Sequence, residues 1–321
     1  MSALDRLPAL ATTGVGSLPF AAPADAARHA ARAYDVPFCP QLPRVDGDMV
    51  REWLGADPGR CGWNPDRDRL RPAAWDAFVA ELRTRPPAHG IVKLQATGPV
   101  TLAIALERAG GGVATGAPSL DLAHQVAAWV GAAVADQIER IAALGLDTLL
   151  VTDEPGLAAA GLSGADVDVW QPLRTAGAAA WGLHICGAVP WGVVDACDPD
   201  VLSFDLGRHG VEPHGRRALR RLVARGRRIA WGVLDPAGSD GAQESAGAAA
   251  AAVSGLGLPL ADVARHSLLT PGCGTGRLGE PRERLVASAL AAAADATRAA
   301  LAAQPHEATR RSARTGELSS S

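Results

Sequence analysis

Short apolar segments alternate with longer alanine-rich segments along most of this chain of 321 residues. The short segments have the length of buried strands and end in Gly, Pro, Ser, Thr or Asp, whereas the longer ones are typical of helices. This alternation predicts parallel strands joined by crossover helices. Eight strands are predicted, over residues 11–17, 36–42, 91–97, 146–152, 180–186, 201–206, 228–234 and 267–272.

Helices are predicted between these strands, over residues 23–34, 72–85, 120–144, 189–196, 215–225, 242–256 and 282–303. Eight strand-and-helix units favour the α/β class and a single (β/α)8 TIM barrel, spanning residues 1–304. An open, doubly wound sheet is the alternative. It is disfavoured because it needs fewer strands and a glycine-rich phosphate turn, which does not follow the first strand.

Two segments fall outside the alternating pattern. Residues 46–72 are rich in Trp, Arg, Asp, Gly and Pro, and they are predicted to form an insertion after the second strand that covers the barrel mouth. Residues 305–321 are polar and unpatterned, which predicts a disordered C-terminal tail.

Composition excludes several classes of function. The formal net charge of −3 gives no long-range attraction to nucleic acid or to an anionic membrane. No apolar run reaches the roughly 18 residues of a membrane span, and the N-terminus lacks the pattern of a secretory signal. We therefore expect a cytoplasmic protein. The five cysteines are odd in number and scattered, which favours reduced thiols over a disulfide framework.

A histidine and two cysteines stand at the ends of predicted strands. His184 and Cys186 are two residues apart, so in a strand they face the same side. Asp205 ends the next strand and Cys273 follows the last one. Strand ends meet at the C-terminal face of a barrel, and imidazole and thiolate are preferred ligands of zinc. The four residues therefore predict a zinc site, because thiolate sulfur argues against magnesium or calcium.

Each of these residues also has a simpler interpretation. Cys273 alone is more often a buried core residue than a ligand. Asp205 precedes a helix and is in the position of a helix cap. The segment Asp153-Glu154-Pro155 can be a plain turn between a strand and a helix. Convergence at one face is the reason to prefer the metal site.

Zinc held by two thiolates carries little residual positive charge, so it activates water poorly. It is better suited to holding a substrate thiol as thiolate, the form that attacks carbon. The sequence therefore predicts alkyl transfer to sulfur. Asp153 or Glu154 is placed to bind an ammonium group or another donor of the substrate.

An ordered set of motifs resembles the catalytic barrel of cobalamin-independent methionine synthase, in the wider superfamily that includes uroporphyrinogen decarboxylase. The motifs extend from about residue 12 to residue 284 and are far more specific together than singly. They lie at residues 12–19 (TTGVGSLP), 97–101 (TGPVT), 153–155 (DEP), 184–186 (HIC), 200–205 (DVLSFD) and 271–274 (PGCG).

The resemblance implies a zinc ion and methyl transfer to the thiolate of homocysteine. His184, Cys186 and Cys273 match zinc ligands of the family, and Asp205 stands where the family has a glutamate ligand. Gly16 and Ser17 match the segment that holds the carboxylate of the amino acid. Asp153 matches the acid that binds its amine.

The sequence departs from the family at several positions. The chain has no room for the additional N-terminal barrel of the folate enzyme, so it is similar to the single-barrel members. Arg51 stands where the family has a second amine-binding glutamate, with Glu52 one position later, and a cation there would repel the ammonium of homocysteine. Residues 233–238 lack the histidine that protonates the folate carrier, and no tryptophan follows residues 97–99. Free methyltetrahydrofolate is therefore not the expected donor.

Three hypotheses follow. The first is a zinc-dependent, methionine synthase-like methyltransferase that acts on homocysteine or a similar small thiol, with a methylated corrinoid on a partner protein as a possible donor. The second is a methylcorrinoid:thiol methyltransferase with a different acceptor. The third is a non-catalytic barrel that binds zinc or a partner. None involves nucleic acid or a membrane.

The zinc site is testable directly. Protein purified without added metal is expected to contain close to one equivalent of zinc, measured by mass spectrometric metal analysis. The Cys273→Ser variant is expected to contain less, because a thiolate ligand is lost. Less than about half an equivalent, or unchanged zinc in the variant, would contradict the prediction.

Overall fold

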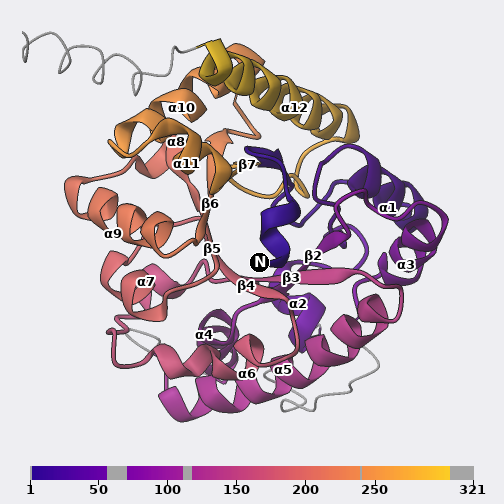
Figure 1. Ribbon diagram of the computed structural model, residues 1–321. Helices are drawn as coiled ribbons and strands as arrows, with labels where there is room; N and C mark the ends of the chain where they lie inside the picture. The colour runs from indigo at the N-terminus through magenta and orange to yellow at the C-terminus, as the bar shows by residue number, and fades with distance from the viewer. Residues whose placement is uncertain (1, 56–70, 111–117, 239–240, 304–321) are drawn as a thin grey trace, which may run out of the picture.

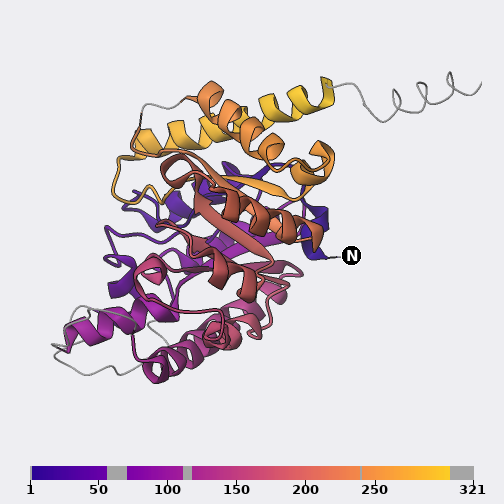
Figure 2. The same cartoon turned by 90° about the vertical axis from the view of Figure 1, so that its left-hand side faces the viewer.

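The computed structural model describes residues 2–55, 71–110, 118–238 and 241–303. Within these residues, seven parallel strands form one curled sheet in the order β1-β7-β6-β5-β4-β3-β2, with helices around its outside (Figures 1 and 2). The strands are β1 Ala11–Thr12, β2 Ile91–Thr97, β3 Asp147–Asp153, β4 Ala180–Ile185, β5 Val201–Asp205, β6 Arg228–Leu234 and β7 Ser267–Pro271.

One of the eight predicted strands, the second in chain order, is not formed. Residues 36–42 make only isolated parallel bridges, between Gln41 and Ser17 and between Phe38 and Lys93. The physical reason is the pair Pro37 and Pro40, which have no N–H to donate to a ladder. The predicted first strand is also shorter, since regular pairing ends at Thr12.

Residues 36–42 nevertheless lie between the two ends of the sheet. The amide of Val36 donates to the carbonyl of Thr12 over 3.0 Å, and the amide of Cys39 donates to the carbonyl of Lys93 over 3.1 Å. The strands follow one another in chain order around the sheet. This order disagrees with a doubly wound sheet, in which the strand order reverses part-way.

The helices cover the outer face of the sheet (Figure 1). The α-helices of the described residues are α1 Pro23–Arg32, α2 Met49–Leu54, α3 Trp75–Thr84, α4 Pro99–Ala109, α5 Leu120–Ala142, α6 Gln171–Arg174, α7 Trp191–Cys197, α8 Leu206–His209, α9 Pro213–Ala224, α10 Ala242–Gly255, α11 Leu260–Arg265 and α12 Glu280–Ala303. Short 3-10 helices are η1 Ala3–Arg6, η3 Leu157–Ala159 and η4 Val167–Trp170.

Only part of the predicted insertion lies among the described residues. It contains the short helix α2, which begins after Asp48, whose carboxylate accepts from the amides of Val50 and Arg51. Residues 56–70 of this insertion and the predicted tail, residues 305–321, lie outside the described residues.

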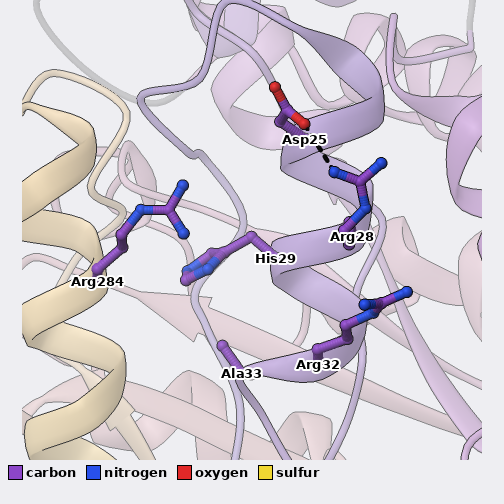
Figure 3. Close-up of a pocket in the computed structure, with 6 residues that line it drawn as sticks. All are labelled: Asp25, Arg28, His29, Arg32, Ala33 and Arg284. Carbon is purple, nitrogen blue, oxygen red and sulfur yellow. Dashed lines mark hydrogen bonds and ion pairs between the residues drawn. The ribbon is translucent and has the colours of Figure 1, made fainter.

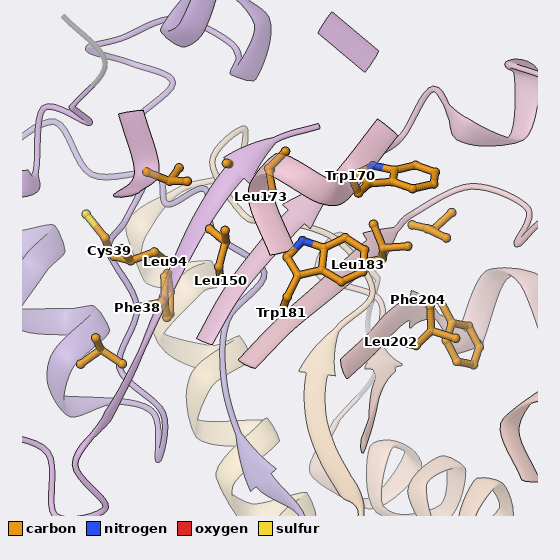
Figure 4. Close-up of a cluster of buried hydrophobic side chains, with 14 of the residues drawn as sticks. Phe38, Cys39, Leu94, Leu150, Trp170, Leu173, Trp181, Leu183, Leu202 and Phe204 are labelled. Atoms are coloured by element: carbon orange, nitrogen blue, oxygen red, sulfur yellow. The ribbon is translucent and has the colours of Figure 1, made fainter. Parts of the chain in front are cut away.

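Successive strand residues divide between two apolar clusters. Leu150 packs outward against the helices, in the larger cluster that Figure 4 shows in part. Its neighbours Leu149 and Val151 pack inward, together with Leu4 and Leu7 at the N-terminus. The helix η1 thus closes one end of the interior, at the centre of Figure 1. The other end is left for polar residues.

Among the helices of the described ranges, α12 is long and apolar enough by length and composition to cross a membrane. In the fold it packs against α10, β1 and β7. Val286 and Leu290 are buried in these contacts, while Leu285 is exposed. This is the pattern of a helix that covers a sheet.

The closure by η1 predicts a stability effect. Leu4→Ala is expected to lower the free energy of unfolding by about 2–4 kcal/mol, because it removes buried methyl groups from the end of the sheet interior. Leu285→Ala is the matched control, since Leu285 is 61% exposed. Urea denaturation measures both, and equal effects in the two variants would contradict the packing role of η1.

Candidate active site at the strand ends

The parallel register places polar side chains side by side where the strands end. Thr97 of β2 pairs with Asp153 of β3, and Asp153 pairs with His184 of β4. His184 in turn pairs with Ser203 of β5. Paired residues in a parallel sheet face the same side. These residues therefore form one layer across the sheet, which the sequence predicted only as separate strand ends.

The two predicted thiol ligands affect each other's pKa. Interaction with the thiol of Cys186 lowers the pKa of Cys273 to about 6. The same interaction raises the pKa of Cys186, and burial adds to this effect. Cys273 is exposed and Cys186 is partly buried. The pair thus favours one thiolate and one thiol at the mouth of the sheet.

His184 is held in a neutral form beneath the thiol pair. Its ring is 4% exposed, and Nδ1 lies 2.8 Å from Oγ of Ser203. Burial lowers the pKa of His184 to about 3, and the charge of Lys93 acts in the same direction. Neutral imidazole is the form that binds metal, and a hydrogen bond at Nδ1 orients the ring for binding through Nε2.

Asp205 occupies the cap position anticipated as the simpler interpretation. It is the last residue of β5 and the cap of α8, and its Oδ1 accepts from the amide of Arg208 over 2.9 Å. The carboxylate also lies against Gly272: a Cβ there would come 2.6 Å from Cγ of Asp205. Only glycine at residue 272 leaves room for this carboxylate next to Cys273.

These four residues fit a zinc ion in part. Two sulfur donors interact, an imidazole is pre-oriented nearby, and the chemistry of the donor set suits zinc. Within the described ranges, however, no three His, Cys, Asp or Glu side chains are grouped closely enough to hold a metal ion. Zinc at His184, Cys186, Asp205 and Cys273 therefore stays a prediction.

Asp153 has one satisfied and one unsatisfied oxygen. Its Oδ2 accepts from Nε2 of Gln95 over 2.5 Å, whereas its buried Oδ1 has no hydrogen-bond partner among the described residues. The side chain is 4% exposed. Burial raises its pKa, and the amide of Gln95 and the charge of Lys93 offset part of this rise. The free oxygen can accept a donor from a ligand.

Glu154, the neighbouring acid, is fully engaged by the protein. One carboxylate oxygen accepts from Nε1 of Trp170 over 2.8 Å, and the other accepts from the amide and hydroxyl of Thr101. The helix α4 begins at Pro99, and Gly98 before it has no side chain to cap the helix, so Glu154 serves as its cap. Its contacts are structural, and substrate binding by Glu154 stays untested.

Gly16 and Ser17 border both halves of the site. A Cβ on Gly16 would lie 2.6 Å from the amide of Gln95, so this position requires glycine. The carbonyl of Ser17 accepts from the amide of Thr275 over 3.0 Å, in the loop that follows Cys273. The segment thus connects the surroundings of Asp153 with those of the thiol pair.

The sequence predicted that Arg51 faces the site. In the structure, the neighbouring Glu52 is the residue that turns inward. Arg51 is exposed, whereas Glu52 is partly buried and accepts from Nε2 of Gln41 over 2.7 Å. Burial raises the pKa of Glu52 to about 8, and the nearby charges of Asp46 and Asp153 contribute. The turn of α2 therefore presents an acid, not a cation, toward Asp153.

Lys93, Gln95 and Gln41 are also missing from the sequence-based site. Lys93 and Gln95 lie two apart in β2, a polar alternation inside an apolar strand that indicates side chains facing the interior. This signal was available in the sequence. Gln41 carried no such signal, because its segment is irregular.

Two surface pockets differ in their relation to this site. One, of about 530 Å³, borders Asp205 and Cys273 and is also lined by Arg208, Ala237 and Arg277. The other, of about 250 Å³, lies between α1 and α12 (Figure 3). Its lining includes the ion pair of Arg28 with Asp25, and His29, whose Nε2 lies 2.8 Å from Oε1 of Glu283. The first pocket is the one that borders Cys273.

Comparison with known proteins identifies the fold. No family model matches the sequence, and no curated protein matches it. The chain is similar to the structure of a B12-independent methionine synthase from Shewanella sp. W3-18-1 in complex with selenomethionine, with 15% identity and a TM-score of 0.61 over 92% of this chain and 100% of that chain. An endo-beta-1,4-glucanase from Bacillus licheniformis has 13% identity and a TM-score of 0.47 over 92% and 61% of the two chains.

The likeness to the methionine synthase supports a methionine synthase-like fold. At 15% identity it shows the fold alone. Activity therefore has to be argued from the residues at the strand ends.

The inward position of Glu52 predicts a pH effect. Its pKa is raised from 4.5 to about 8 in the folded state. Stability from this group is therefore complete below about pH 4.5 and is lost as the pH rises toward 8. Glu52→Gln cannot ionise, so its stability is expected to fall less over this window than that of the wild type.

Urea denaturation at several pH values measures the difference between the wild type and Glu52→Gln. Glu139→Gln, at an exposed position of α5, is the control and should follow the wild type. Parallel pH profiles of the wild type and Glu52→Gln would contradict the inward placement.

Proposed function

We propose that this protein is a zinc-dependent, methionine synthase-like methyltransferase that transfers a methyl group to homocysteine or a similar amino thiol. The observation that carries the proposal is the unpartnered Oδ1 of Asp153, a buried acceptor within electrostatic range of Cys273. The structural likeness to a B12-independent methionine synthase supports the same reading. We also infer that residues 36–42 complete a closed, TIM-like barrel.

The proposed ligand meets the site at three points. Its ammonium donates to Asp153, and the carboxyl group of Glu52 lies nearby, since the charge of Asp153 contributes to the raised pKa of Glu52. Its carboxylate lies along Gly16 and Ser17. Its sulfur lies at Cys186 and Cys273. A ligand with an ammonium at one end and a thiol at the other matches the positions of Asp153 and of the two cysteines.

Glu52 changes the choice of acceptor. With Arg51 exposed, no cation of α2 opposes a substrate ammonium. This favours homocysteine over the alternative acceptor that carries an anion near residue 51. A barrel that only binds zinc or a partner would not need an open acceptor at Asp153.

His184, Cys186 and Cys273, with Asp205, would hold the zinc, which when bound would keep the acceptor sulfur as thiolate. The acid residues orient the substrate so that its sulfur faces the donor. A sulfur–carbon bond forms as the bond from the methyl group to its carrier breaks, and the electron pair of that bond stays with the carrier.

The donor side is the pocket of about 530 Å³ beside Cys273. Ala237 lines this pocket in the segment that lacks the histidine of the folate enzyme. This supports a donor other than free methyltetrahydrofolate, such as a methylated corrinoid carried by a partner protein. Localisation in the cytoplasm belongs to the same proposal.

Homocysteine binding tests the function. X-ray absorption of the zinc-loaded protein should show one additional sulfur neighbour of the metal after L-homocysteine is added. Unchanged sulfur coordination would exclude homocysteine as the acceptor. It would favour the hypothesis of a non-catalytic barrel that binds zinc or a partner.

Asp153→Asn should weaken L-homocysteine binding by about 10- to 100-fold in calorimetry, because the charge-assisted hydrogen bond to the ammonium is lost. Asp295→Asn, whose side chain is 78% exposed on α12, is the control. Equal affinities of the two variants would argue against Asp153 as the ammonium site.

A further inference from the structure

One lysine lies in the interior of the sheet, next to the proposed ammonium site. Lys93 is the only lysine of the chain, in which every other basic side chain that is not histidine is an arginine. It is 3% exposed, and Gln95 and Asp153 beside it are 5% and 4% exposed. A sequence that otherwise uses arginine thus has a compact ammonium at this one place.

These three side chains form a chain of hydrogen bonds. Nζ of Lys93 donates to the carbonyl of Val15 over 2.6 Å and to Oε1 of Gln95. Nε2 of Gln95 donates to Oδ2 of Asp153 over 2.5 Å. Lysine can only donate, so it fixes which end of the Gln95 amide faces it. The NH2 end must then face Asp153.

This arrangement leaves Oδ1 as the open acceptor of Asp153. Lys93 and Asp153 form no direct ion pair among the described residues, because Gln95 lies between them. The charge of Lys93 lowers the pKa of Asp153 and so favours its carboxylate form. A cationic ligand that donates to the buried Oδ1 supplies the partner that this oxygen lacks.

Gln95 also sets the position of the neighbouring loop. Its amide lies where a Cβ of residue 16 would be, at 2.6 Å, so the backbone of Gly16 packs directly onto it. Lys93 holds the carbonyl of Val15 in the same loop. The same two side chains therefore fix Asp153 and the segment of Gly16 and Ser17.

We propose that Lys93 and Gln95 are positioning residues that make the site selective for ligands with a primary ammonium, by holding Asp153 with a single oxygen left without a protein partner. This inference rests on the proposed function, and it names the residues that set its substrate specificity. Neither residue needs to touch the substrate sulfur or the donor.

The test compares two thiols on the zinc-loaded, full-length protein. L-homocysteine and 4-mercaptobutanoate differ in the ammonium group alone, and calorimetry gives the dissociation constant of each. The wild type should prefer L-homocysteine by at least about tenfold. Gln95→Met and Lys93→Met should reduce this preference to about twofold or less, with 4-mercaptobutanoate bound about as in the wild type.

A merely structural role gives a different result. Equal loss of affinity for both thiols, or an unchanged preference, would overturn the inference while the proposed function stands. A wild type that binds neither thiol, or shows no preference, would overturn the proposed function and the inference with it. Lys93→Arg keeps the positive charge but changes the size and shape of the group that carries it. The larger guanidinium should not maintain the preference for L-homocysteine.

The single lysine provides a readout that needs no variant. In protein labelled with 13C and 15N in lysine, one side-chain signal reports Lys93 if the Met variants fail to fold. L-homocysteine should shift this signal, because its ammonium changes the charge next to Asp153, and 4-mercaptobutanoate should leave it in place. The same shift with both thiols, or none with either despite binding, would contradict the inference.

Discussion

The in-register pairing of the parallel strands is the constraint on which the candidate site depends. It places Asp153 opposite His184, and His184 opposite Ser203, on three neighbouring strands. A slip of one residue would turn each of these side chains to the other face of the sheet. Apolar neighbours such as Leu149 and Leu150, which pack on opposite faces, oppose such a slip. The hydrophobic cores therefore fix the chemistry as well as the fold.

Burying several ionisable groups at one end of the sheet is costly, and the structure offsets this cost by pairing them. Glu154 is taken up by the start of α4 and by Trp170, and Lys93 by Val15 and Gln95. Asp153 keeps one oxygen without a donor. In a site where the other buried acids are satisfied, that exception is the clearest sign that a ligand belongs there.

The order of strands and helices could be predicted from the sequence because both have a characteristic length and period. The prediction of a strand at residues 36–42 was wrong. It followed the apolar content of this segment and gave too little importance to its two prolines, Pro37 and Pro40. The inward position of Glu52 could not be predicted from the sequence, for a different reason. A one-residue difference in where α2 begins decides which side chain turns inward, and only the packing of α2 sets it.

The sequence alone determined the alternating α/β pattern, the positions of His184, Cys186 and Cys273 at or just after strand ends, and the resemblance to the methionine synthase barrel. Only the tertiary structure decided which acids stabilise the fold through their hydrogen bonds and which keep an oxygen without a partner. Asp153 and Glu154 are adjacent and chemically alike, yet one caps a helix and the other faces the site. The reason is physical: a carboxyl group's role depends on the donors that surround it, and those come from segments far apart in the chain.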